Sequence, residues 1–184
     1  MRTIELTQGK EVKVDKEDYD VLSKFNWSYT SPDGYAVRKG RRNTDEPRTV
    51  HMHRVIMKAK PEQQLDHING DKLDNRKANL RFATTQENSF NRKKPDVDCT
   101  SQYKGVLKRK KAKSWEARIK FNDRALHLGS YRNEIEGAMA YNEAAKIMFG
   151  EFARLNDVYE APDHIKRHVA EKCHQRLKEE SIAI

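Results

Sequence analysis

The feature that most restricts the fold of this chain is a polar, aperiodic stretch near its middle, Asn91 to Gln102. It contains Pro95 and shows neither the alternation of a strand nor the apolar period of a helix. Strand and helix patterns occur on both sides of it. Because 184 residues suffice for two small domains, we interpret residues 93–102 as a linker between two small cores.

Charge is spread unevenly along the chain. The formal net charge is +9; residues 1–92 carry 18 Lys and Arg against 14 Asp and Glu, residues 93–132 carry 12 against 4, and residues 133–184 carry 7 against 10. A basic cluster favours a polyanionic partner, since neutralised phosphates release condensed counterions, although a solvated basic surface gives the same counts. We find no apolar run long enough to cross a membrane and no signal-peptide stretch, so we expect an intracellular protein.

Residues 1–49 are expected to form a strand-rich leader. Apolar and polar residues alternate over 3–6 and 11–14, and Asp15 has the position of an N-cap ahead of a short helix. The Ser-Pro-Asp-Gly sequence at 31–34 is a strong turn signal between two further strands. The basic segment that follows is either a mobile solvated loop or a source of phosphate contacts from Arg38, Arg41 and Arg42.

The next segment combines a strand, a loop and a helix. Residues 49–56 have the composition of a strand, and residues 66–80 are so dense in Asp, Asn, Gly and Lys that they predict a long structured loop. Thr84 and Glu87 have capping-box spacing, which predicts a helix from about Thr85.

Three side chains of this segment suit phosphodiester hydrolysis, which needs a base for water and a cation for the leaving oxygen. His67 suits the base, because imidazole titrates near neutrality. The oxygens of Asp66 and Asn88 suit Mg²⁺ or Mn²⁺ better than zinc. Neighbouring strand residues point to opposite faces, so a bend near Asp66 would have to bring both side chains around one phosphate. An Asp-His pair alone is a weak signal and is more typical of a capped loop with a surface histidine that has no chemistry.

The order and spacing of several elements together resemble the HNH homing endonucleases of phages and mobile introns. The matching elements lie between residues 50 and 92: Met52-His53-Arg54, Leu65 to Gly70, Asn75, Asn79-Leu80-Arg81 and Thr85-Gln86-Glu87-Asn88. The resemblance implies a ββα-metal fold in which His67 is the general base. It also implies that Asp66 and Asn88 hold one divalent cation. Asn79, the middle Asn of the motif, would brace the loop and orient His67.

The resemblance also implies a reaction. Water would attack the phosphorus in line while the metal stabilises the departing 3′ oxygen, leaving a 5′ phosphate and a 3′ hydroxyl. The last motif position is often His; Asn88 departs from that as the magnesium-using subgroup does, so we expect one Mg²⁺ or Mn²⁺ per site. His53 would have a structural or substrate-positioning role, and His51 a structural one. One site cuts one strand, so a monomer would nick, whereas a dimer could cut both strands.

Residues 103–158 predict a three-stranded antiparallel sheet packed on one helix. The strands are expected at 103–109, 115–121 and 125–131, with a hairpin turn at 121–124. Asn133 with Glu136 marks the helix start and Gly150 its end, and its apolar face comprises Ile135, Ala138, Met139, Ala145, Met148 and Phe149. Residues 159–184 predict a helical tail in which Ile165, Val169, Cys173 and Leu177 recur every four residues.

This second half resembles the plant Apetala-two, or ethylene-response-factor, DNA-binding domain. The matching residues include Tyr103 to Val106, Trp115 to Ile119, Leu128 to Tyr131 and Gly150 to Asn156. The resemblance implies that one face of the sheet enters the major groove. By position, the DNA contacts would come from Lys104, Arg109, Arg118 and Lys120, with added phosphate contacts from Lys108, Lys110, Lys111 and Lys113. Leu107 stands where the plant proteins usually have Arg, so the plant recognition sequence is in doubt.

We therefore expect an α+β protein: an HNH nuclease domain at 1–92 (leader 1–49, ββα-metal core 50–92), a linker at 93–102, a DNA-binding domain at 103–158 and a helical tail at 159–184. It would be a site-specific, divalent-metal-dependent DNA endonuclease in the cytoplasm of a bacterial or phage-infected cell. Its partner would be double-stranded DNA, with no membrane and no small-molecule substrate, and we expect a monomer.

Two other functions remain open. A DNA-binding regulator with a vestigial HNH segment would have no reason to keep the whole set of Asp66, His67, Asn79 and Asn88. An RNA-binding protein would present aromatic side chains on its basic sheet for base stacking, and few are available there.

Overall fold

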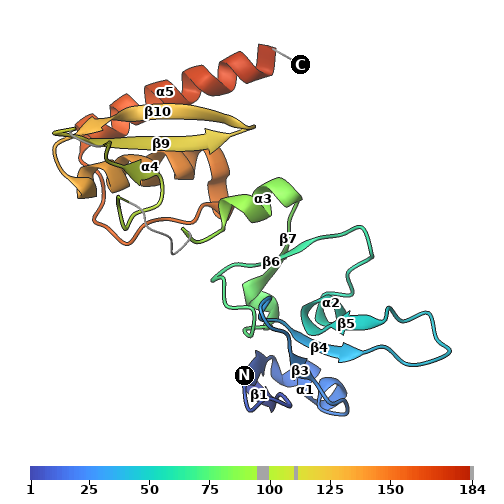
Figure 1. Cartoon of the computed structure of the whole chain (residues 1–184). Helices are drawn as coiled ribbons and strands as arrows, with labels where there is room; N and C mark the ends of the chain where they lie inside the picture. Colours follow the sequence, from blue (N-terminus) through green and yellow to red (C-terminus); the bar gives the residue numbers. More distant parts are fainter. Residues whose placement is uncertain (95–99, 110–111, 183–184) are drawn as a thin grey trace. The chain divides into compact units, whose positions relative to one another are not determined.

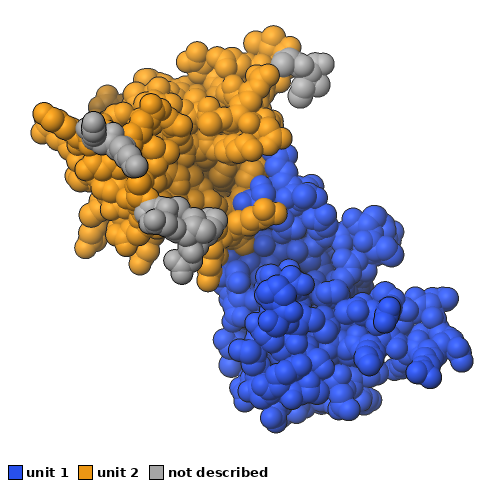
Figure 2. Space-filling model, in the orientation of Figure 1, with its two compact units in different colours: residues 1–89 blue, residues 90–184 orange. Residues whose placement is uncertain are grey.

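The computed structural model describes residues 1–94, 100–109 and 112–182 (Figure 1). The chain divides into two compact units, residues 1–89 and 90–184, coloured separately in Figure 2. The second unit begins before the expected linker: the ring of Phe90 stacks on that of Phe149 with centroids 3.8 Å apart. The ammonium group of Lys94 donates to the carbonyl of Tyr103, and Ser101 is buried. Described residues of the expected linker therefore pack within unit 2.

Unit 1 is built from short strands and short helices. They follow the order β1 (Arg2–Glu5), β2 (Glu11–Val14), α1 (Lys16–Leu22), β3 (Ser28–Tyr29), β4 (Ala36–Lys39), β5 (Thr49–His51), α2 (Met52–Ile56), β6 (Leu65–His67), the 3-10 turn η1 (Lys77–Asn79), β7 (Leu80–Phe82) and α3 (Thr85–Phe90). The strands form three antiparallel sheets, β1-β2, β3-β4-β5 and β6-β7. The turn signal at 31–34 lies where it was predicted, between β3 and β4.

One core holds the leader and the HNH segment together. It contains Trp27, which is 1% exposed and donates its indole N–H to the carbonyl of Leu22 at 2.8 Å. Side chains from both parts of unit 1 share this cluster: Ile4, Leu6, Val12, Val14 and Ala36 from the leader, and Val50, Met52, Ile56 and Leu80 from the HNH segment. The leader is therefore part of the nuclease unit's packing.

Residues 52–56 form the helix α2, so the strand predicted for 49–56 was wrong in its second half. A continued strand would turn Arg54 toward the same face as Met52 and Ile56, and both of these are buried. In the helix the guanidinium of Arg54 instead donates to the carbonyl of Gln63 at 2.8 Å. The helix buries Met52 and Ile56 while the charged side chain of Arg54 stays hydrogen-bonded, and this gain in free energy outweighs the strand propensity of the local sequence.

Unit 2 contains a three-stranded antiparallel sheet covered by helices. Its elements are β8 (Val106–Leu107), β9 (Trp115–Phe121), β10 (Arg124–Tyr131), α4 (Glu134–Phe149), the 3-10 turn η2 (Gly150–Phe152) and α5 (Asp163–Ile182), with sheet order β10-β9-β8. The predicted hairpin turn is confirmed, since Asn122 and Asp123 both have positive φ, as a two-residue turn between twisted strands requires. The helix start is confirmed as well, because the side chain of Asn133 accepts from the Glu136 amide at 2.8 Å.

The C-terminal tail is a 20-residue helix, α5, and it belongs to the core of unit 2. Ile165, Val169 and Cys173 are buried in the cluster that contains Leu128. On α4 the expected apolar face is largely buried, but Ile135 is 44% exposed, because it lies in the first turn of the helix. None of the helices in the described part of the chain has the length and apolar composition needed to span a membrane.

Candidate active site and candidate DNA-binding sheet

The ribbon β6-β7 and the helix α3 carry the residues of the HNH segment. β6 pairs with β7 in regular register, with Asp66 opposite Arg81 and His67 opposite Leu80. The predicted capping box is confirmed: the Glu87 amide donates to Thr84 Oγ1 at 3.2 Å, and the Thr84 amide donates to the Glu87 carboxylate at 2.7 Å. This cap fixes the start of the helix that bears Asn88. The pairing continues in register through His67, so the ribbon has no bulge at Asp66, and the bend expected there stays a prediction.

His67 is buried and held by a neighbouring amide. Its side chain is 5% exposed, and its Nε2 lies 2.8 Å from Oδ1 of Asn75. Burial lowers the pKa of His67, and the hydrogen bond to Asn75 opposes this shift only in part. The imidazole is thus neutral near neutral pH. Since a carbonyl oxygen only accepts, Nε2 carries the proton and Nδ1 keeps the lone pair that a base needs.

An aromatic wall faces His67. The ring of His53 lies 5.2 Å from it, nearly perpendicular, and the ring of Tyr35 lies 6.0 Å from it. His53 is 8% exposed, and burial lowers its pKa to about 3. The ammonium of Lys72 sits 4.3 Å from the centre of the Tyr35 ring, and the ring of His51 lies 5.5 Å from that of His53. The wall is therefore polar but mostly uncharged.

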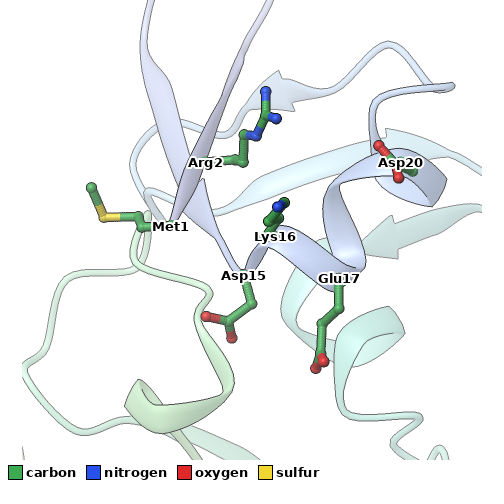
Figure 3. Close-up of a pocket in the computed structure, with 6 residues that line it drawn as sticks. All are labelled: Met1, Arg2, Asp15, Lys16, Glu17 and Asp20. Carbon is green, nitrogen blue, oxygen red and sulfur yellow. The ribbon is translucent and has the colours of Figure 1, made fainter.

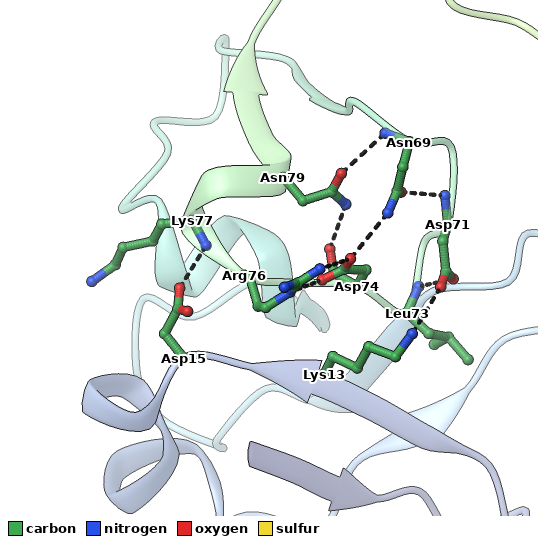
Figure 4. A network of polar contacts seen from close by, with 9 residues as sticks. All are labelled: Lys13, Asp15, Asn69, Asp71, Leu73, Asp74, Arg76, Lys77 and Asn79. Carbon is green, nitrogen blue, oxygen red and sulfur yellow. Dashed lines mark hydrogen bonds and ion pairs between the residues drawn. The ribbon is translucent and has the colours of Figure 1, made fainter. Parts of the chain in front are cut away.

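The loop after β6 is braced by a partly buried polar network (Figure 4). Asn79 donates its amide to the carbonyl of Asp74 at 2.8 Å and accepts from the Asn69 backbone amide at 3.0 Å. The Asp74 carboxylate accepts from Arg76 at 2.6 Å and 2.7 Å and from the Asn69 side chain at 3.0 Å; the Arg76 guanidinium lowers the pKa of Asp74. Asn79 thus bridges two parts of the loop. The role of Asn75 was not predicted. Its position matches the family motif, but only the structure shows that its side chain is hydrogen-bonded to His67.

The leader pairs directly with this loop. The Lys13 amide donates to the carbonyl of Leu73 at 2.7 Å, and the Asn75 amide donates to the carbonyl of Lys13 at 2.8 Å. Asp15 occupies the N-cap position of α1, but its side chain does not cap that helix; it accepts from the Lys77 backbone amide at 2.8 Å instead (Figure 4). β2 therefore fixes the backbone of the residue that holds His67.

Asp66 and Asn88 offer oxygen donors on neighbouring elements. Asp66 Oδ2 accepts from Arg81 at 2.7 Å and 3.0 Å, with side-chain exposures of 11% and 12%. The Asn88 amide nitrogen donates to Gln64 at 3.3 Å, and Gln64 is the residue two before Asp66, on the same face of an extended chain. A hollow of about 480 Å³, lined in part by Gln64 and Glu87, opens beside α3.

A second hollow of unit 1 lies at the start of the chain, between β1 and α1 (Figure 3). It is lined by side chains of both charge signs and by Met1: Arg2, Asp15, Lys16, Glu17 and Asp20. The carboxylate of Asp15 is engaged by the Lys77 amide, as described above. The hollow is open and its charged side chains are of opposite sign, so we assign it no catalytic residues.

Two of the basic residues expected to contact DNA have structural partners. The ammonium of Lys104 donates to the carbonyls of Phe90 and Arg92 at 2.5 Å and 2.8 Å, and burial lowers the pKa of Lys104 to about 8. The Arg38 guanidinium makes a two-pronged ion pair with Glu46 at 2.7 Å and 2.9 Å and is only 9% exposed. Lys104 and Arg38 thus have partners within the chain, and their predicted contacts with DNA stay predictions. Arg41 and Arg42 are exposed.

The outer face of the β8-β9-β10 sheet carries most of the remaining basic candidates. Ala117 and Ile119 of β9 point into the core, so Glu116, Arg118 and Lys120 share the opposite face. Lys113 and Arg109 are exposed beside it, and the ammonium of Lys108 lies 5.1 Å from the Trp115 ring. Lys110 and Lys111 lie outside the described residues. The face is accessible to a partner, but its positive charge is partly compensated.

Comparison with known proteins identifies the family of the HNH segment. A family model described as HNH endonuclease matches residues 50–90, which comprise α2, the β6-β7 ribbon and α3. An uncharacterized HNH endonuclease of Acanthamoeba polyphaga mimivirus is 31% identical over 147 residues, covering 80% of this chain and 74% of the viral protein. The dehydration-responsive element-binding protein 2C of Arabidopsis thaliana is 45% identical over 56 residues, covering 29% of this chain and only 16% of the plant protein.

These matches define a nuclease, a hydrolase of phosphodiester bonds. The chain belongs to the HNH endonuclease family, whose substrate is DNA and whose members generally use divalent metal ions.

Proposed function

We propose that this protein is a site-specific, divalent-metal-dependent DNA endonuclease in which unit 1 cuts and unit 2 holds the target. The observation that carries this proposal is the buried, neutral imidazole of His67, fixed through Nε2 by Asn75 at 2.8 Å and directly preceded by Asp66. A surface histidine without a function needs neither burial nor a buried amide partner.

The residues of the site perform the steps that hydrolysis requires. His67 Nδ1 takes the proton of the attacking water, and the hydrogen bond from Nε2–H to Asn75 stabilises the imidazolium that forms. His53 and Tyr35 pack against the His67 ring and exclude bulk water from it. Asn79 keeps the loop closed, so that Asn75 stays in place.

The donor chemistry of the site fits a hard divalent cation. Asp66 and Asn88 would hold it with one carboxylate and one amide oxygen, and Mg²⁺ and Mn²⁺ are commonly bound by one or two such groups together with phosphate and water. The described residues contain no cluster of three His, Cys, Asp or Glu side chains that could hold a metal ion. When bound, the cation supplies charge stabilisation to the departing 3′ oxygen. The ion pair with Arg81 holds the Asp66 carboxylate in place.

Unit 2 supports this activity by holding DNA on its sheet. The exposed basic residues Lys113, Lys120 and Arg109 make phosphate or base contacts, and the partial similarity to the plant DNA-binding protein supports the same role. Joining a nuclease unit that binds DNA weakly to a DNA-binding unit in one chain raises the effective concentration of the nuclease at its target site. We propose that a monomer nicks one strand, as a homing or free-standing endonuclease.

Relaxation of a supercoiled plasmid that carries DNA neighbouring the gene tests this function. In Mg²⁺ the wild type should nick it, and DNA ligase should reseal the nick because the ends are 5′ phosphate and 3′ hydroxyl. His67→Ala should remove activity, whereas His168→Ala, the same change on the exposed face of α5, should not. Equal nicking by wild type and His67→Ala would remove His67 as the base. A wild type that binds DNA but never cuts would indicate a regulator.

A further inference from the structure

The outer face of the β8-β9-β10 sheet has an acidic residue at its centre. Glu116 lies on β9, the middle strand, and is paired in register with Leu107 of β8 and Ser130 of β10. Neither neighbour carries a charge. A carboxylate at this point is unexpected on a surface that is to bind a polyanion, because it repels phosphate.

Two arginines converge on this carboxylate. Arg109 Nε lies 2.9 Å from Glu116 Oε1, and an Arg118 terminal nitrogen lies 2.6 Å from Oε2. The side chain of Glu116 is 17% exposed, while those of Arg118 and Arg109 are 36% and 65% exposed. Each oxygen thus holds one guanidinium, and both arginine side chains stay partly exposed, although Arg118 Nε is buried without a hydrogen-bond partner among the described residues.

This clamp changes what the two arginines can do. A free arginine is flexible and binds any phosphate, whereas an arginine whose planar fork is held in place can pair with one base edge, most commonly O6 and N7 of guanine. The carboxylate also cancels one of the two positive charges, which weakens contacts that any DNA sequence could satisfy. The two effects act in the same direction, toward discrimination between sequences.

We propose that Glu116 is a specificity-determining residue of the DNA-binding sheet: it positions Arg109 and Arg118 for base edges and suppresses their sequence-independent contacts with phosphate. The inference rests on the proposed role of unit 2 in binding DNA. It assigns Glu116 a positioning role, since the donors that meet the bases belong to the two arginines.

The full-length chain with His67→Ala, which by the proposed function should leave DNA uncut, is the protein for the test. Its preferred duplex is selected from a random pool, and binding to that duplex and to a shuffled one is measured over a range of salt concentrations. Glu116→Gln keeps the shape and removes the charge. Asp123→Asn is the matched control, because Asp123 pairs with Lys120 at 2.8 Å on the same sheet and its loss changes the net charge equally.

Glu116→Gln should bind the shuffled duplex more tightly, with a steeper salt dependence, and should lose about tenfold of the preference for the selected duplex. Asp123→Asn should strengthen binding to both duplexes alike and keep the preference. Glu116→Asp, which keeps the charge but cannot reach both guanidiniums, should lose the preference without gaining affinity for the shuffled duplex. Thermal unfolding of each variant confirms that the sheet is folded.

An unchanged preference in Glu116→Gln, or an equal loss in Asp123→Asn, would overturn the inference and leave DNA binding by unit 2 intact. A parent protein that binds neither duplex would overturn the role of unit 2 and the inference together.

Discussion

His53 should make unit 1 sensitive to mild acid. Burial lowers its pKa from 6.5 to about 3, so below pH 6.5 the unfolded chain binds a proton that the folded unit does not. The free energy of unfolding therefore falls as the pH falls through this window. One pKa unit corresponds to about 1.4 kcal/mol, and lowering the pH from 7 to 5 should thus remove about 2 kcal/mol of stability through His53 alone.

Urea unfolding at both pH values measures this loss. The chain has two tryptophans; a Trp115→Phe background leaves Trp27, which is buried in unit 1, as the fluorescent probe. His53→Phe keeps a ring in the aromatic wall and removes the titration. The window stays above the range in which most carboxylates titrate, and His51 and His67 titrate in both proteins. If the free energy of unfolding falls by the same amount between pH 7 and pH 5 in the parent and in His53→Phe, the reasoning is refuted.

Two further substitutions separate chemistry from structure. Asn75→Ala should slow nicking about a hundredfold at unchanged DNA affinity, because His67 loses the acceptor that orients it; single-turnover cleavage measures this, and an unchanged rate would contradict the positioning role. Lys104→Met should leave DNA affinity unchanged, since its ammonium donates to the carbonyls of Phe90 and Arg92, whereas Lys113→Met should weaken binding. Titration of duplex DNA compares the two, and an equal loss of affinity would return Lys104 to the DNA-binding surface.

The parts of the fold that local chemistry decides were predictable from the sequence. The capping box of Thr84 and Glu87, the N-cap Asn133 and the hairpin turn at 122–123 all involve partners within a few residues. α2 was missed because its reason is distant: Arg54 needs carbonyls supplied by a later loop. Local propensity carries no information on such partners.

The same division applies to the functional residues. Family spacing singled out Asp66, His67, Asn79 and Asn88. In the structure Asp66 and His67 are consecutive residues of β6, and Asn88 lies on α3. Family spacing could not show that Asn75 contacts His67, or that Arg38 and Lys104 have partners within the chain. A basic side chain looks the same in sequence whether its charge faces DNA, a carboxylate or a carbonyl, and only tertiary packing decides.

The pairing of β2 with the catalytic loop determines which piece of this protein could be grafted elsewhere. Transplanting residues 50–90 alone would leave the Leu73 carbonyl and the Asn75 amide without Lys13 and would strip Leu80 of its leader-side neighbours. The smallest segment that could be transferred is residues 1–89. Without the leader, the loop that carries Asn75 would lose its backbone partner Lys13, and His67 would no longer be held in the same orientation.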